Sequence, residues 1–313
     1  MTYKGFLIFA KVSRREPMKF LNNCLKVARI DSWLGWIFCF CFGSIFLGFP
    51  SLERVITVLF AFSFATAGVF ILNQFFDREE DRENALKSNL PVASGKMTPR
   101  TALILSLSLI VLCLFLVFIV AASLISLFLI YLALWTAYSV PPLRLKSVPI
   151  MDFIISGVGA GLLPFLIGIG VSSKPNVSIS LILMSAIALM LAHSGGHILQ
   201  ALGDHEADHK MGVRTFVVKY GRKKGVIIMG FLSLTAGLLP FIYAVFGSLP
   251  SSYFLLFFLP LLLCIPIAKR YMATIKNPTT ENVVSLQKAT RRYGIIIMVV
   301  VGAYVLVGKI LGL

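Results

Sequence analysis

The chain has 313 residues, of which 58% are hydrophobic and only 13% are charged. Soluble domains carry about 25% charged residues, so this composition excludes an ordinary soluble protein and predicts an integral membrane protein surrounded by membrane lipid. The formal net charge is +16 at pH 7, but the basic residues are spread over several polar segments. We therefore expect no nucleic acid as a partner.

The first predicted element is an amphipathic helix within residues 1–30. Its apolar residues recur near helical spacing and alternate with basic ones, as in an interfacial helix that lies on a membrane surface. These apolar residues are Phe20, Leu21, Cys24, Leu25 and Ala28. We expect residues 1–30 to form this interfacial segment and residues 31–313 to form one membrane domain.

Charge-free stretches then predict nine membrane-spanning helices, since about 20 apolar residues are needed for each. Two of the stretches are long enough for two helices, with turns expected near residues 121–123 and 247–252. In chain order the stretches are 32–52, 55–76, 101–143 (two helices), 153–173, 175–203, 225–268 (two helices) and 293–308.

The basic residues predict how these helices are oriented. With the N-terminus in the cytoplasm, all but three of the 29 Lys and Arg fall on the cytoplasmic side, the exceptions being Arg54, Lys174 and Lys309. Positive residues accumulate in cytoplasmic loops of membrane proteins. We therefore expect a protein of the cell membrane whose N-terminus and longest polar loops are cytoplasmic.

Eight of the 13 acidic residues gather in two clusters, 77–83 and 204–208, each at the end of a predicted span. Asn73, Asp77 and Asp81 recur every four residues, as do Asp204 and Asp208, so each set shares one helix face. Oxygen-rich edges of this kind suit Mg²⁺, which binds a few carboxylates together with water and phosphate oxygens. Two facing edges would hold Mg²⁺ around a diphosphate.

The alternative is that these carboxylates are solvated residues at ordinary helix ends. We expect the other acidic residues of the clusters to point away from the site and to be solvated or paired with Arg78 and Arg82. These other residues are Glu79, Glu80, Glu83 and Glu206.

Three motifs follow one another along the chain: Asn73-x-x-x-Asp77-x-x-x-Asp81, Tyr138-Ser-Val-Pro-Pro-Leu-Arg144-Leu-Lys146, and Asp204-x-x-x-Asp208. In order, spacing and placement they resemble the UbiA family of intramembrane aromatic prenyltransferases. Leu90-Pro-Val-Ala-Ser-Gly95 and Arg29…Trp33 look like further landmarks of that family.

The resemblance implies an all-α membrane protein, with nine transmembrane helices bundled around a central cavity that cytoplasmic loops cap. It implies that Mg²⁺ and an isoprenyl diphosphate donor are bound by Asn73, Asp77, Asp81, Asp204 and Asp208. Contacts to the diphosphate or to the developing allylic cation would come from Lys146, Arg144, Tyr138 and Arg29.

The chain departs from the family pattern at two places. Many members have Arg where this chain has Leu90, so diphosphate contacts from that loop are expected from Arg82, Lys87 or Lys96. Many members also have an Asn-Asp pair where this chain has Gln200-Ala201. These departures leave the number of metal ligands and the acceptor class open.

The implied activity is Mg²⁺-dependent transfer of an isoprenyl group to a lipophilic or aromatic acceptor, with quinone biosynthesis of the menaquinone type as the expected setting. A glycerol-phosphate lipid or a tetrapyrrole is the alternative acceptor. An alternative of another class is a cation-coupled transporter, but transporters place ionisable residues near the middle of the membrane. Asp31 and Asp152 lie instead at the ends of predicted spans.

Three further residues have open roles. Asp152 is either the base that removes a proton from the acceptor or an ordinary helix N-cap. His193 and His197 are spaced i, i+4 on the sixth predicted span. Because no third ligand is evident near them, we expect these histidines to have a polar role in the interior, toward the acceptor, rather than to bind a metal.

Overall fold

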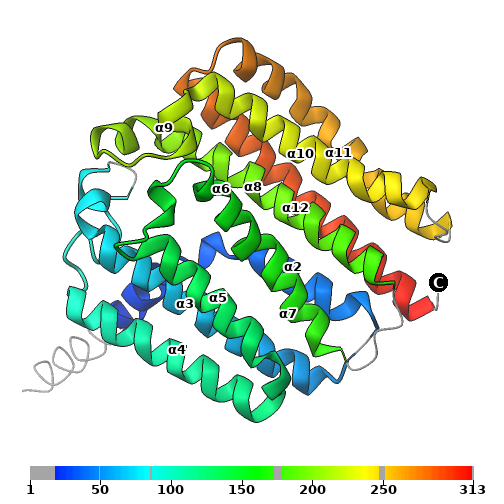
Figure 1. Cartoon of the computed structure of the whole chain (residues 1–313), viewed down its shortest axis with the longest axis horizontal. Coiled ribbons are helices and arrows are strands. Elements are labelled where there is room, and N and C mark those ends of the chain that lie inside the picture. Colours follow the sequence, from blue (N-terminus) through cyan, green and yellow to red (C-terminus); the bar gives the residue numbers. More distant parts are fainter. Residues whose placement is uncertain (1–17, 49, 85–86, 173–177, 247–250, 312–313) are drawn as a thin grey trace, which may run out of the picture.

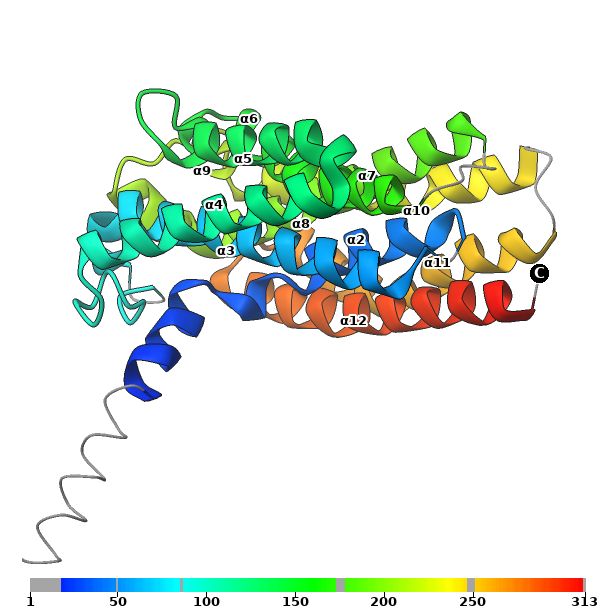
Figure 2. The same ribbon diagram turned by 90° about the horizontal axis from the view of Figure 1, so that it is seen from below.

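The computed structural model describes residues 18–48, 50–84, 87–172, 178–246 and 251–311. Within these ranges every regular element is a helix, which confirms the all-α prediction. The long helices lie side by side as a bundle, and a helix beginning at residue 18 projects away from it (Figures 1 and 2). Phe20, Leu21 and Leu25 are exposed on this projecting helix. That residues 1–30 form an interfacial segment stays a prediction.

The elements are short 3₁₀ helices (η1, η2, η3), one π-helical segment (η4) and α-helices. In chain order they are η1 (Ile30–Ser32), α2 (Leu34–Phe46), α3 (Leu52–Glu83), α4 (Pro99–Ala121), η2 (Ala122–Leu124), α5 (Ile125–Ser139), η3 (Leu145–Ser147), α6 (Met151–Gly157), η4 (Val158–Leu162), α7 (Leu163–Val171), α8 (Ile179–Lys210), α9 (Phe216–Tyr220), α10 (Arg222–Phe246), α11 (Ser251–Lys276) and α12 (Thr280–Leu311).

Six helical segments of the described residues are long and apolar enough to cross a membrane, judged by length and composition. One of them, Pro99–Ser139, is 41 residues long and contains both α4 and α5. Between these two helices, at η2, the chain reverses direction (Figure 1). The turn predicted near residues 121–123 is therefore confirmed. The second predicted turn falls largely on residues 247–250, which lie outside the described ranges. The total of nine spans stays a prediction.

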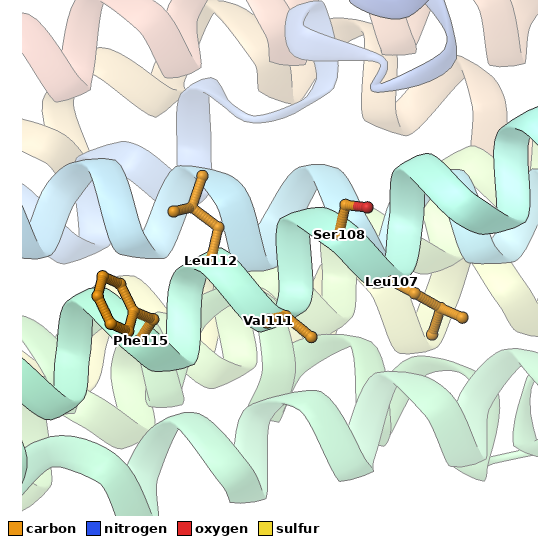
Figure 3. Close-up of a pocket in the computed structure, with 5 residues that line it drawn as sticks. All are labelled: Leu107, Ser108, Val111, Leu112 and Phe115. Atoms are coloured by element: carbon orange, nitrogen blue, oxygen red, sulfur yellow. The ribbon is translucent and has the colours of Figure 1, made fainter.

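The outer face of α4 is apolar. Large hydrophobic side chains remain exposed along it, and a shallow depression on this face is lined by one helix alone (Figure 3). The lining residues are Leu107, Ser108, Val111, Leu112 and Phe115. Since they carry no charge, this surface suits contact with lipid chains and is separate from the acidic motifs.

Helices α3 and α8 carry the acidic motifs and continue beyond the predicted spans, to Glu83 and Lys210. Ser51 is the N-cap residue of α3, and its hydroxyl accepts a hydrogen bond from the Arg54 amide. It packs against α4 and α5, whereas α8 packs against α6 and α10. Extension of both helices keeps the acidic residues in helical register, so each motif presents one face.

Candidate active site

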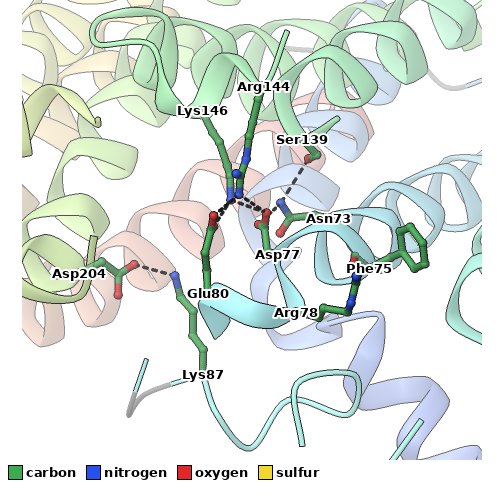
Figure 4. Close-up of polar contacts among 10 residues, drawn as sticks. All are labelled: Asn73, Phe75, Asp77, Arg78, Glu80, Lys87, Ser139, Arg144, Lys146 and Asp204. Carbon is green, nitrogen blue, oxygen red and sulfur yellow. Dashed lines mark hydrogen bonds and ion pairs between the residues drawn. The ribbon is translucent and has the colours of Figure 1, made fainter. Parts of the chain in front are cut away.

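The two acidic motifs meet at one end of the bundle. Asp77 and Asp81 lie in the last turns of α3, and only 5% and 7% of their surfaces are exposed. Asp204, in the last turns of α8, lies with its Oδ2 atom 3.1 Å from Lys87 Nζ on the loop that follows α3 (Figure 4). Solvated residues at ordinary helix ends would not be buried in this way. The two motifs therefore form one site.

The loop between α5 and α6 brings two cations to this site. Lys146 Nζ lies 2.5 Å from Asp77 Oδ1, and Arg144 Nη2 lies 3.2 Å from the same oxygen (Figure 4). Arg144 has a φ of 39°, a left-handed conformation that residues other than glycine rarely adopt. Backbone strain of this kind persists only where surrounding contacts hold it. The ion pairs of Arg144 and Lys146 supply such contacts.

Asn73 orients Asp77 from the preceding turn of α3. Its Nδ2 donates a hydrogen bond of 2.6 Å to Asp77 Oδ2 and another of 3.2 Å to Ser139 Oγ, at the end of α5. The amide thus fixes the carboxylate and joins α3 to α5. Asp77 therefore contacts both Asn73 and Lys146. Residues from two of the three sequence motifs thus meet at one carboxylate.

Arg82, Lys87 and Lys96 were predicted to contact the diphosphate. Of these three residues, Lys87 reaches the carboxylates. Burial opposes its charged form, but attraction from Asp204 and Asp81 prevails and raises the pKa of Lys87 above its ordinary value. Arg82 pairs instead with Glu79 at 2.9 Å, and its side chain is 55% exposed. Lys96 is exposed as well. The structure therefore does not bring Arg82 or Lys96, two predicted substrate-binding residues, to the carboxylate cluster.

The different positions of Lys87 and Lys96, two lysines of the loop between α3 and α4, lead to a testable prediction. Replacing Lys87 by methionine is expected to weaken Mg²⁺-dependent binding of geranyl diphosphate by about 30-fold, because a partly buried charge partner is lost. Lys96→Met is expected to change the affinity by less than about threefold, as for an exposed charge. Titration calorimetry on both variants measures the difference. Equal losses would contradict this placement of the two side chains.

Glu80 corrects a prediction. It was expected to be solvated or paired with Arg78 or Arg82, but its carboxylate binds Arg144 and lies 3.2 Å from Lys146 Nζ. A signal for this was present, since residues three apart are neighbours on a helix and Glu80 follows Asp77 by three.

Two other glutamates of the clusters, Glu79 and Glu206, form ion pairs near the surface. Glu79 pairs with Arg78 and Arg82, as predicted. Glu206 pairs with Arg222, a residue of α10, at 3.1 Å.

Aromatic and polar side chains extend from the acidic site into the bundle. Tyr138 Oη lies 3.4 Å from His197 Nε2, and the Tyr138 ring meets Trp135 edge to face with a centroid distance of 5.2 Å. Trp135 stacks on Trp36 of α2 with a centroid distance of 4.7 Å. These rings line the interface of α2, α5 and α8 beside the charged cluster.

Arg29 and His193 lie outside this group of rings, Arg29 just before η1 and His193 on α8. Arg29 lies over the Phe70 ring, 5.7 Å from its centroid. His193 Nε2 lies 3.3 Å from Cys39 Sγ. These contacts agree with a polar interior role for His193 and His197. No group of three potential metal-binding side chains contains them within the described residues.

Asp152 has a structural partner. It is 1% exposed, and its Oδ2 accepts a 2.7 Å hydrogen bond from the Phe216 amide at the start of α9. Asp152 therefore binds the first amide of α9, whose N-cap residue is Thr215. This bond fixes the chain segment that follows the second acidic motif.

The donor set fits Mg²⁺. It consists of carboxylates and an amide, the oxygen ligands that this ion prefers. In the described part of the chain, no three His, Cys, Asp or Glu side chains converge closely enough to enclose an ion alone. The ammonium groups of Lys87 and Lys146 already stand against these carboxylates, so positive charge is stable there.

Comparisons with known proteins agree with this geometry. The model of the UbiA prenyltransferase family matches residues 35–286. The chain is 31% identical over 186 residues to the chloroplastic 2-acylphloroglucinol 4-prenyltransferase of Humulus lupulus, covering 54% of this chain and 43% of that protein. The chain thus spans less than half the length of this plant relative. It is 27% identical over 234 residues to digeranylgeranylglyceryl phosphate synthase of Pyrococcus horikoshii, covering 72% of this chain and 78% of that one.

The fold is also similar to a solved structure. A UbiA homolog from Archaeoglobus fulgidus, bound to GPP and Mg²⁺, superposes with a TM-score of 0.73 at 23% sequence identity. The superposition covers 91% of this chain and 98% of that one. At this identity the likeness shows a common fold.

Proposed function

The chain belongs to the UbiA prenyltransferase family, and from that membership we propose that it transfers an isoprenyl group from an isoprenyl diphosphate to a hydrophobic acceptor. The observation that carries the proposal is the convergence of two acidic helix ends with cations from two loops, in the pairs Lys146–Asp77 and Lys87–Asp204. Such a site binds a polyanion through cations and a metal ion together. We place it on the cytoplasmic side of the cell membrane, on the basis of the distribution of Lys and Arg.

Each part of the site has a separate task in this reaction. Lys87, Arg144 and Lys146 bind phosphate oxygens by charge-assisted hydrogen bonds. Asn73 orients the Asp77 carboxylate. Mg²⁺, held by Asn73 and the aspartates at 77, 81, 204 and 208, would neutralise part of the diphosphate charge and make it a better leaving group.

The interior residues act on the organic part of the substrate. When the C–O bond of the donor breaks, its electron pair stays on the diphosphate and an allylic cation remains. The rings of Trp135 and Tyr138 offer π-faces to that cation and restrict the access of water. A nucleophilic atom of the acceptor then bonds to the allylic carbon and loses its proton.

The acceptor class is the finer part of the proposal. The relatives are named for a 2-acylphloroglucinol and for digeranylgeranylglyceryl phosphate, and the archaeal synthase is matched over 78% of its length. This coverage favours a glycerol-phosphate lipid as the acceptor. A quinone precursor of the menaquinone type is our second candidate acceptor. No relative favours a tetrapyrrole among the matches described above. A cation-coupled transporter is disfavoured because the carboxylates of the site lie at helix ends.

The test is release of diphosphate by purified protein with geranyl and geranylgeranyl diphosphates. The acceptors offered are geranylgeranylglyceryl phosphate, an acylphloroglucinol and 1,4-dihydroxy-2-naphthoate. We expect turnover with one acceptor that requires Mg²⁺ and stops with EDTA. Failure to bind any prenyl diphosphate with Mg²⁺ would refute the function. Binding without turnover would refute only the proposed acceptors.

A further inference from the structure

Glu80 binds both cations that the proposed function assigns to the diphosphate. One of its carboxylate oxygens accepts a hydrogen bond from Arg144 Nη2, and the other lies 3.2 Å from Lys146 Nζ (Figure 4). The same two cations contact a single oxygen of Asp77. Two carboxylates therefore neutralise two cations.

These side chains are shielded from water. The exposed fraction is 21% for Glu80, 28% for Arg144 and 13% for Lys146. Attraction between charges increases as water is removed, so these pairs are stronger than exposed ones. A carboxylate that spans a guanidinium and an ammonium also presents two oxygens to them, as a phosphate group does.

The neighbouring Glu79 shows that this placement is particular to position 80. Its side chain is 64% exposed and pairs with Arg78 and Arg82 on the outer side of α3. Glu80 also lies outside the Asn73, Asp77 and Asp81 set, whose members share a helix face at four-residue spacing. A rotation about its own side-chain torsions can therefore separate Glu80 from the cations without moving that set.

We propose that Glu80 is an internal anion that occupies the place of the donor diphosphate between Arg144 and Lys146, and that the donor displaces it on binding. This proposal rests on the proposed function. Displacement opposes donor binding and leaves another negative charge near the diphosphate. Glu80 therefore lowers the affinity for the donor and increases its dependence on Mg²⁺, whose positive charge offsets that repulsion.

The test is titration calorimetry of inorganic diphosphate and geranyl diphosphate into the purified full-length protein, with Mg²⁺ or with EDTA. Glu80→Gln keeps the shape of the side chain and removes its charge. We expect it to bind both ligands about tenfold more tightly than wild type with Mg²⁺, a change of about 1.4 kcal/mol. We also expect it to show measurable binding in EDTA.

Glu79→Gln is the matched control, because it makes the same change one residue away on the exposed side of α3; we expect wild-type affinity. Glu80→Asp withdraws the carboxylate by one methylene, so its affinity should lie between those of wild type and Glu80→Gln. It decides the question if Glu80→Gln does not fold. Thermal unfolding measures whether Glu80→Gln and Glu80→Asp are folded.

Unchanged or weaker diphosphate binding by the folded variants would overturn the proposal, since it would show that Glu80 only positions the two cations. If wild type binds neither ligand with Mg²⁺, the proposed function itself fails. The wild-type titration therefore separates the two failures.

Discussion

Replacing Asp77 by asparagine is expected to reduce the rate of prenyl transfer by about a thousandfold, the scale of losing a main electrostatic group of an active site. Asp77 contacts Lys146 and Arg144, accepts a hydrogen bond from Asn73, and is 5% exposed. Asparagine has the same shape but no charge, so it binds a divalent cation weakly. Glu80 would still contact both cations, and we therefore expect the variant to fold.

The measurement is product formation at saturating geranyl diphosphate and Mg²⁺, together with thermal unfolding of each variant. Glu83→Gln is the control, since Glu83 is exposed at the end of the same helix. We expect it to retain wild-type activity. Folded Asp77→Asn protein with more than a tenth of wild-type activity would contradict the assignment of Asp77 to the metal and the diphosphate.

Replacing Lys146 by methionine is expected to lower kcat/KM for the donor by about a hundredfold, the effect of removing one partner of a buried, hydrogen-bonded charge pair. Methionine fills the space of the lysine stem without its ammonium. Asp77 and Glu80 would then face Arg144 alone, and their uncompensated charge would repel the diphosphate.

Steady-state kinetics with varied geranyl diphosphate measure this loss. Lys146→Arg restores the charge in a different geometry, so we expect it to recover part of the activity. Lys269→Met, at an exposed position of α11, is the control for losing one positive charge at the surface. If Lys146→Met and Lys269→Met behave alike, Lys146 does not bind the diphosphate.

The parts of the site that the sequence predicted are those that depend on a single helix. Asn73, Asp77 and Asp81 share a face of α3 because 3.6 residues make one turn, and this holds wherever the helix lies. The reversal between α4 and α5 followed from an apolar run too long for one crossing. Membership of the UbiA family was likewise readable from the order and spacing of three motifs.

Contacts between distant segments were not predictable in this way. Lys87 pairs with Asp204, 117 residues away, and Lys146 pairs with Glu80, 66 residues away. Hydrophobic periodicity shows which face of a helix is apolar, but it does not give the rotation and crossing angle of one helix against another. The selection of Lys87 instead of Arg82 or Lys96 depends on those angles and on the path of the loop.

By itself, the sequence determined that this protein is helical, membrane-embedded and equipped with two acidic motifs, because composition and helical spacing are local properties. Only the tertiary structure decided that Glu80 binds the cations of the loop after α5 and that Asp152 binds the first amide of α9. Those pairings exist because packed helices bring charged groups together in a poorly solvated place, where leaving one unpaired is costly.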